Sequence, residues 1–316
     1  MDPYLSIVIP IYNEEENIPA LWERLSRVMK EHFSDTAKPW EIIFTDDGSR
    51  DRSLVMLLDL ARTEPRVKVV EFNRNYGQHS AIFGAFAEVR GQVVVTLDAD
   101  LQNPPEEIPK LVAKTEEGYD VVGGWRQGRQ DNDSFFRTMP SKIVNAITRK
   151  TTGVVLHDYG CMLRAYSRDV VDAMLLCKER SSFIPALANS FAKRITEVPV
   201  AHAERAAGTS KYGLWKLINL QFDLLTSFSL LPLQMLSVFG VITAALGFLL
   251  FLGLVVYRFM HPEGTAQGVF TLFAILFFFV GCQFIAFGLL GEYIGRIYQE
   301  VRDRPRYMVK KVHQAK

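Results

Sequence analysis

The N-terminal part of the chain alternates short apolar runs with longer segments in which apolar residues recur at helical spacing. Strands that alternate with helices in this way form a mostly parallel sheet that helices cover on both faces. We therefore predict an α/β fold for this part of the chain. The expected strands are residues 5–12, 41–47, 67–72, 93–100 and 119–124, and the expected helices are residues 13–33, 53–62, 78–89 and 105–117.

Two of the expected helices have recognisable starts. Asn13 and Glu16 stand at the spacing of a capping box, in which each side chain satisfies a free backbone N–H group of the other residue. Pro104 and Pro105 are expected to stop the fourth strand and start the next helix, because proline lacks an N–H group and suits a first helical turn.

Two later segments, residues 233–257 and 269–290, contain no charged residue. A helix rises about 1.5 Å per residue and the hydrocarbon core of a bilayer is about 30 Å thick, so each segment is long enough to span a membrane. The alternative is a pair of buried core helices. Residues 211–231 are apolar with sparse polar side chains, which favours a helix in the membrane interface over a further core helix.

These patterns divide the chain into an α/β domain (1–210), juxtamembrane helices (211–232), a transmembrane hairpin (233–291) and a C-terminal tail (292–316). The tail is basic and the connector 258–268 carries one arginine, so the positive-inside rule predicts that both ends face the cytoplasm. The three cysteines form no CxxC pair, and we expect neither a disulfide nor a zinc site. The basic tail residues are Arg296, Arg302, Arg304, Arg306, Lys310, Lys311 and Lys316.

Composition and motifs exclude several function classes. A formal net charge of +1 provides no overall basic field, so we expect no nucleic-acid partner. The dinucleotide fingerprint GxGxxG does not follow the first strand, where "PIYNEEEN" stands instead, and the chain contains no GxxxxGK[ST] phosphate loop. An NAD enzyme and a phosphate-loop ATPase are therefore disfavoured.

Acidic residues follow the expected strands at the point where parallel sheets bind ligands, outside the carboxyl ends of the strands. Glu14 follows the first strand, and the second and fourth strands end in pairs of aspartates. Three acidic sites around one crevice would repel a nucleotide diphosphate unless a divalent cation lay between them. The pairs are Asp46 with Asp47 and Asp98 with Asp100.

Asp98 and Asp100 are the candidate metal ligands. They are two residues apart, so in a regular strand both side chains face the same way, and Gln102 continues the spacing. Mg²⁺ or Mn²⁺ bound there would neutralise the diphosphate and stabilise the departing nucleotide. The alternative for such a short motif is a solvated acidic turn.

Basic residues after the fifth strand and before the membrane segments could bind a phosphorylated partner, since guanidinium groups suit phosphate oxygens. The alternative for each arginine is a solvated loop position. Asp158, in "HDYGCMLRAY", is the candidate base, although a phosphate acceptor with a second pKa of about 6 is already largely ionised and needs little help. The basic segments contain Arg126, Arg129, Arg137, Ser141 and Lys142, and then Arg205 and Lys211.

Several motifs occur in an order that resembles the family-two glycosyltransferases with a GT-A fold, and within them the branch that moves a sugar from a nucleotide to a polyprenyl phosphate. The resemblance covers nearly the whole chain and implies transfer of 4-deoxy-4-formamido-L-arabinose from UDP to undecaprenyl phosphate. It further implies an inverting reaction, a role in lipid A modification and polymyxin resistance, and a place in the bacterial inner membrane with the catalytic domain in the cytoplasm. The motifs are "PIYNE", "DDGSRD", "NRNYGQHSAI", "DADLQNPPEEIP" and "DYGCMLRAY".

The resemblance also implies a role for each motif residue. UDP contacts fall on Pro10, Tyr12, Glu14, Asp46, Asp47, Arg205 and Lys211, and the acceptor phosphate falls on Arg126, Arg137 and Ser141. Asp98, Asp100 and Gln102 would hold Mg²⁺ or Mn²⁺, and Asp158 and Asp100 would be the catalytic acidic residues. Members of this branch often assemble as tetramers, so a homo-oligomer is expected in contact with membrane lipid.

Three alternatives remain at this point. The same reaction could use glucose, mannose or N-acetylglucosamine, because sugar selectivity depends on a few pocket contacts that no motif encodes. A noncatalytic membrane scaffold could keep the fold, although the intact aspartates argue against it. A processive polysaccharide synthase is disfavoured because the chain lacks the QxxRW motif.

Overall fold

The computed structural model describes residues 2–33, 37–126, 158, 160–177, 183–202, 231–260, 268–302 and 304–315. The chain divides into two compact units. One comprises Met1–Leu214 together with Arg304–Lys316, and the other comprises Trp215–Asp303.

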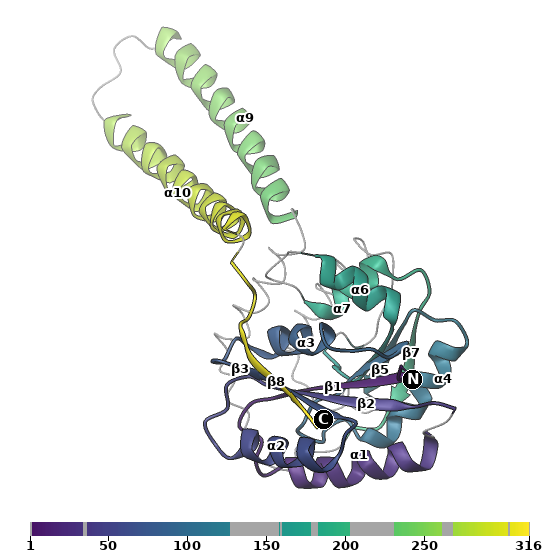
Figure 1. Cartoon of the computed structure of the whole chain (residues 1–316). Coiled ribbons are helices and arrows are strands. Elements are labelled where there is room, and N and C mark those ends of the chain that lie inside the picture. The colour runs from purple at the N-terminus through teal and green to yellow at the C-terminus, as the bar shows by residue number, and fades with distance from the viewer. Residues whose placement is uncertain are drawn as a thin grey trace. The chain divides into compact units, whose positions relative to one another are not determined.

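The first unit is built on an eight-stranded sheet in the order β7-β5-β6-β4-β1-β2-β3-β8 (Figure 1). The central strands β4, β1, β2 and β3 are parallel to their neighbours in this group, and β5 is parallel to β7, whereas β6 and β8 pair antiparallel. The prediction of a mostly parallel α/β sheet is confirmed. The strands are β1 (Leu5–Ile11), β2 (Trp40–Asp46), β3 (Val67–Phe72), β4 (Val93–Thr96), β5 (Val121–Arg126), β6 (Arg164–Ser167), β7 (Ile195–Val200) and β8 (Val309–Gln314).

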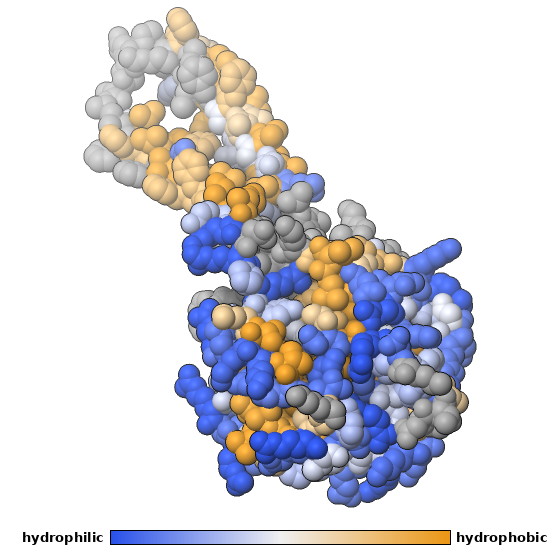
Figure 2. All heavy atoms as spheres, viewed as in Figure 1, coloured by the Kyte–Doolittle hydropathy of each residue, from blue (hydrophilic) through white to orange (hydrophobic). Residues whose placement is uncertain are grey.

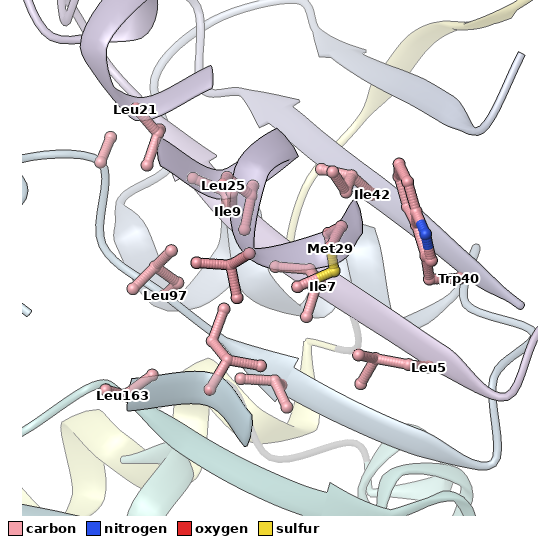
Figure 3. Close-up of a cluster of buried hydrophobic side chains, with 14 of the residues drawn as sticks. Leu5, Ile7, Ile9, Leu21, Leu25, Met29, Trp40, Ile42, Leu97 and Leu163 are labelled. Atoms are coloured by element: carbon pink, nitrogen blue, oxygen red, sulfur yellow. The ribbon is translucent and has the colours of Figure 1, made fainter. Parts of the chain in front are cut away.

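Helices cover the sheet on both faces and create two hydrophobic layers. On one face, α1 (Ile18–His32), α2 (Ser53–Thr63) and α4 (Ile108–Glu116) pack against the sheet. In this layer Leu5, Ile7 and Ile9 of β1 belong to one buried cluster with Leu21 and Leu25 of α1 (Figure 3). On the other face lie α3 (Gln78–Phe86), α6 (Arg168–Leu176) and α7 (Ile184–Phe191). Alternate residues of β1 point to opposite layers, as the two-residue period of a strand requires.

The first helix starts later than the capping-box pattern predicts. α1 begins at Ile18, with Asn17 rather than Asn13 at its N-cap, and no side chain caps it. Asn13 has a left-handed backbone with φ 55°, and its side-chain oxygen accepts a hydrogen bond from the N–H of Arg50 at 2.8 Å. The capping-box prediction is therefore wrong, because this polar side chain joins two loops instead of closing a helix.

The C-terminal segment contains a strand that the sequence analysis did not predict. β8 pairs antiparallel with β3 and forms one edge of the sheet. Tyr307 stacks on Phe72 with ring centroids 4.9 Å apart, and Arg306 lies over the ring of Phe83 at 4.2 Å. Residues that follow the last long helix in sequence are thus part of the α/β unit.

The second unit contains two long apolar helices, α9 (Leu231–Met260) and α10 (Gly268–Val301). Leu233–Leu250 and Phe278–Gly295 are each long and apolar enough to cross a membrane, and 0% and 6% of these windows are buried. Many large hydrophobic side chains are exposed on both helices, and most of their coloured surface in Figure 2 is hydrophobic. Such exposure does not fit buried core helices and favours membrane association.

Candidate active site

The site lies where the central parallel strands end. Ile11 of β1 is in register with Asp46 of β2, and Val8 of β1 is in register with Thr96 of β4. The segments after these three strands therefore emerge at the same edge of the sheet, which is the place where open α/β sheets bind ligands. This arrangement brings Glu14, Asp47 and Asp98 to one location, as the sequence pattern predicts.

A cleft of about 380 Å³ opens at this edge. Six of its lining residues are predicted site residues: Pro10, Tyr12, Glu14, Asp47, Asp98 and Asp100. The remaining lining residues are Ile11, Asn75, Gly77, Gln78 and Ala99.

Two loops at one wall of the cleft are joined by reciprocal hydrogen bonds. The N–H of Asn13 donates to Ser49 Oγ at 3.1 Å, and the N–H of Glu14 donates to Ser53 Oγ at 2.9 Å. Asn17 Nδ2 donates to the Glu14 carboxylate at 2.6 Å. The bonds of Asn13 and Glu14 hold the loop after β1 against the segment that leads from β2 into α2.

Asp46 and Asp47 are adjacent in sequence, but only Asp47 lines the cleft. Asp46 is 1% exposed and does not line the cleft, and its carboxylate accepts a hydrogen bond from the N–H of Ser49 at 3.2 Å. Asp47 lines the cleft and accepts hydrogen bonds from the N–H groups of Tyr76 at 2.7 Å and Gly77 at 2.8 Å. Burial raises the pKa of both carboxyl groups. Asp47 thus orders the segment before α3 at the cleft.

Asp98 and Asp100 both line the cleft, although β4 ends before them at Thr96. Gln78 Nε2 donates to Asp98 Oδ1 at 2.6 Å. The N–H of Gln102 donates to Asp100 Oδ1 at 3.1 Å, and Gln102 does not line the cleft. Leu101 between them has a left-handed backbone with φ 59°, so a turn rather than a regular strand positions this motif.

Two carboxylates that line a cleft fit a divalent cation that also binds a ligand's phosphates. Within the described ranges, no group of three or more His, Cys, Asp or Glu side chains is placed to hold a metal alone. Mg²⁺ in nucleotide sites is commonly held by one or two carboxylates together with substrate phosphates and water. Asp98 and Asp100 match that donor set.

Asp158 forms a bidentate ion pair with Arg126, the last residue of β5. Arg126 Nε lies 2.6 Å from Asp158 Oδ2, and Nη2 lies 2.9 Å from Oδ1. Both side chains are 11% exposed. Burial lowers the pKa of Arg126, but the hydrogen bond and charge of Asp158 outweigh it and the pKa is raised. The structure thus brings together one predicted acceptor-binding residue and the predicted base.

Four predicted site residues, Arg137, Ser141, Arg205 and Lys211, lie outside the described residues. The cleft also contains Asn75, Gly77 and Gln78, which the sequence analysis did not select. All three belong to the motif "NRNYGQHSAI", so the motif itself was the available signal.

Comparison with known proteins identifies the family. Residues 6–175 match the model of glycosyl transferase family 2, and this segment includes every described residue of the cleft. The chain belongs to glycosyl transferase family 2. It is therefore a glycosyltransferase, and the cleft is the candidate donor site of this family-2 enzyme.

Similar curated proteins share nearly the whole chain. The undecaprenyl-phosphate 4-deoxy-4-formamido-L-arabinose transferase of Enterobacter sp. (strain 638) is 55% identical over 311 residues, which are 98% of this chain and 93% of that protein. The transferase of the same description from Proteus mirabilis (strain HI4320) is 56% identical over 310 residues, which again are 98% of this chain and 93% of that protein. Among solved structures, a mannosyltransferase from Pyrobaculum calidifontis aligns with 96% of this chain and 89% of its own at 15% identity and a TM-score of 0.45.

Proposed function

We propose that this family-2 glycosyltransferase transfers 4-deoxy-4-formamido-L-arabinose from UDP to undecaprenyl phosphate. The observation that carries the proposal is identity above 50% over nearly the full length to transferases described by that reaction. The similarity includes the acidic cleft and both apolar helices, because the aligned segments cover at least 98% of the chain in these relatives. A role in lipid A modification and polymyxin resistance follows from the proposed product.

The donor occupies the cleft of about 380 Å³ in this proposal. Tyr12 and Glu14 contact the uridine, and Asp47 keeps the segment before α3 in place through Tyr76 and Gly77. Asp98 and Asp100 are the residues that would hold Mg²⁺ or Mn²⁺ in the cleft. When bound, the cation would neutralise negative charge on the departing UDP.

The acceptor contributes an oxygen of its phosphate. This oxygen forms a bond to the anomeric carbon while the bond from that carbon to the UDP oxygen breaks, so UDP leaves and the anomeric configuration inverts. Asp158 orients the acceptor phosphate and takes its remaining proton where one is present. Arg126 binds the phosphate, because a guanidinium forms bidentate hydrogen bonds with phosphate as it does here with Asp158.

The two apolar helices place the reaction at a membrane in this proposal. α9 and α10 hold the enzyme in the bacterial inner membrane. The α/β unit faces the cytoplasm, because UDP-sugars are found there and because the basic residues after α10 favour that side of the membrane. Several copies assemble, with a tetramer as the expected state.

The proposal is tested by transfer of radiolabelled sugar to undecaprenyl phosphate by the purified full chain in lipid. UDP-formamido-arabinose, UDP-glucose and UDP-N-acetylglucosamine are supplied in parallel. Labelling from the first donor alone is the expected result. Labelling from another donor instead would contradict the proposed sugar, and no labelling by folded, lipid-bound protein would contradict the transferase activity itself.

A further inference from the structure

The side chain of Arg164 is completely buried in the α/β unit. It is the first residue of β6 and is 0% exposed. Among the described residues it is the largest side chain that is fully buried. Burying a guanidinium costs free energy unless its hydrogen bonds are satisfied. Packing alone therefore does not explain why an arginine is buried at this position.

The guanidinium is used to hold the loop that carries Asp158. Nε of Arg164 donates to the carbonyl oxygen of Cys161 at 2.9 Å, and Nη2 donates to the carbonyl oxygen of Asp158 at 2.8 Å. Its third nitrogen, Nη1, is buried and makes no hydrogen bond in the described part of the chain. Both of its hydrogen-bond partners among the described residues are thus backbone carbonyl groups of one short loop.

The strand beside Arg164 leaves space for this guanidinium. Gly123 of β5 is paired with Arg164, and a Cβ atom at this glycine would lie 3.2 Å from Nη1. The same Cβ would lie 3.4 Å from Cγ of Glu197 on β7. Glu197 Oε1 accepts a hydrogen bond from the N–H of Asp158 at 3.3 Å. The backbone of Asp158 is therefore held at its N–H group by Glu197 and at its carbonyl group by Arg164.

We propose that Arg164 is a positioning residue for Asp158. It acts through the backbone: by fixing the carbonyl groups of Asp158 and Cys161, it sets the direction in which the Asp158 carboxylate meets Arg126 and the acceptor phosphate. The inference rests on the proposed function, because it assigns Asp158 a role in sugar transfer. It adds a residue that does not line the donor cleft.

The test compares Arg164→Lys with the wild-type full chain in lipid. Lysine keeps the charge but cannot donate to both carbonyl groups in the same geometry. We expect kcat to fall roughly 100-fold, the loss that a displacement of about 1 Å causes in a reacting group. The Kd for UDP should stay within about twofold, because Arg164 is outside the cleft. Arg168→Lys is the matched control. Arg168, in α6, also donates to a backbone carbonyl oxygen, that of Val89 in the loop between α3 and β4, but within the described residues it makes no hydrogen bond to the loop that carries Asp158.

A double-mutant cycle separates positioning from general destabilisation. If Arg164 acts through Asp158, Arg164→Lys should reduce kcat much less in an Asp158→Asn background than in the wild type. Equal fold losses in both backgrounds, or unchanged kcat in Arg164→Lys, would overturn the inference. A fully active Asp158→Asn variant would also overturn the inference, because Arg164 would then have no catalytic partner to position. An inactive wild type would instead overturn the proposed function, which separates the two failures.

A second variant applies if Arg164→Lys does not fold. Gly123→Ala keeps the arginine and brings a methyl group to within 3.2 Å of Nη1, so the guanidinium must shift by a few tenths of an ångström. We expect a smaller loss of kcat in the same direction, with UDP binding unchanged and with the loss again absent in the Asp158→Asn background. A Gly123→Ala enzyme with wild-type kcat would overturn the inference.

Discussion

Nε2 of Gln78 lies 2.6 Å from Oδ1 of Asp98 and connects the start of α3 to the beginning of the segment that follows β4. This bond fixes one oxygen of a proposed metal ligand. Hydrogen bonds of this kind orient metal-binding carboxylates and are a substantial part of metal affinity.

Gln78→Ala should therefore weaken metal binding without removing a ligand. We expect the Mn²⁺ concentration that gives half-maximal transfer to rise about 10- to 100-fold, the usual effect of losing such a partner. Gln92→Ala, at an exposed position away from the cleft, is the control. An unchanged Mn²⁺ requirement in the Gln78 variant would show that the bond to Asp98 has no part in metal binding.

Gly77 lines the cleft and Gly48 follows the cleft residue Asp47, and the two glycines allow a comparison. Both have positive φ, of 69° and 93°, so alanine at either position costs about 1–3 kcal/mol of conformational strain. A Cβ at Gly48 would also lie 2.5 Å from the backbone of Arg74, whereas one at Gly77 would meet nothing within 4 Å. We expect Gly48→Ala to lower the unfolding temperature more than Gly77→Ala. Equal unfolding temperatures in detergent would contradict the close packing of these loops.

The acidic cleft could be predicted from sequence because it depends on strand periodicity. Apolar runs that end in Asp47 and Asp98 must bring those residues to the same edge of a parallel sheet, and the structure places both in the cleft. Gln78 and Asn75 could not be selected in this way, because their positions depend on how the segment before α3 turns back on Asp47. No periodic pattern encodes that turn.

The unpredicted strand β8 illustrates a different limit. Its sequence, "VKKVHQ", is largely exposed and carries no alternating apolar face. Its pairing with β3 is supported by side chains far away in sequence, where Lys310 and His313 contact Glu71. Arg164 was missed for a related reason: a single arginine at the start of a short strand gives no sign that its partners will be backbone carbonyl groups.

The contact between β8 and Glu71 should be sensitive to acid. Lys310 Nζ lies 2.6 Å and His313 Nε2 lies 2.9 Å from the Glu71 carboxylate. Burial raises the pKa of Glu71, but these hydrogen bonds and charges outweigh it and hold the pKa below its ordinary value of 4.5. A carboxyl group with a lowered pKa in the folded state stabilises that state fully above its ordinary pKa. This stabilisation is lost as the pH falls through the lowered value.

Hydrogen exchange in β8 measures this effect. We expect the protection of residues 309–314 to decrease as the pH is lowered below about 4.5, after correction for intrinsic exchange rates. Glu71→Gln should show weaker protection near neutral pH and no such decrease. The same acid-induced decrease in the Glu71 variant would mean that another group is responsible.

Asp158→Asn tests the role of the ion pair with Arg126. We expect kcat to fall by about 10²- to 10⁴-fold if the carboxylate takes a proton in the transition state. The Kd for UDP should not change, because Asp158 does not line the donor cleft. Asp172→Asn is the control, since Asp172 also pairs with an arginine, Arg168 at 2.8 Å, but is exposed on α6. Turnover near the wild-type value would exclude a role for Asp158 as a base.

In the proposed mechanism Asp98 and Asp100 bind a divalent cation together with UDP in the cleft after β1, β2 and β4. The decisive experiment is calorimetric titration of UDP into the purified full chain, first with Mn²⁺ and then with EDTA, for the wild type and for Asp100→Asn. We predict that Mn²⁺ tightens UDP binding at least tenfold in the wild type and has little effect in the variant. Equal UDP affinity with Mn²⁺ and with EDTA in the wild type would contradict the claim.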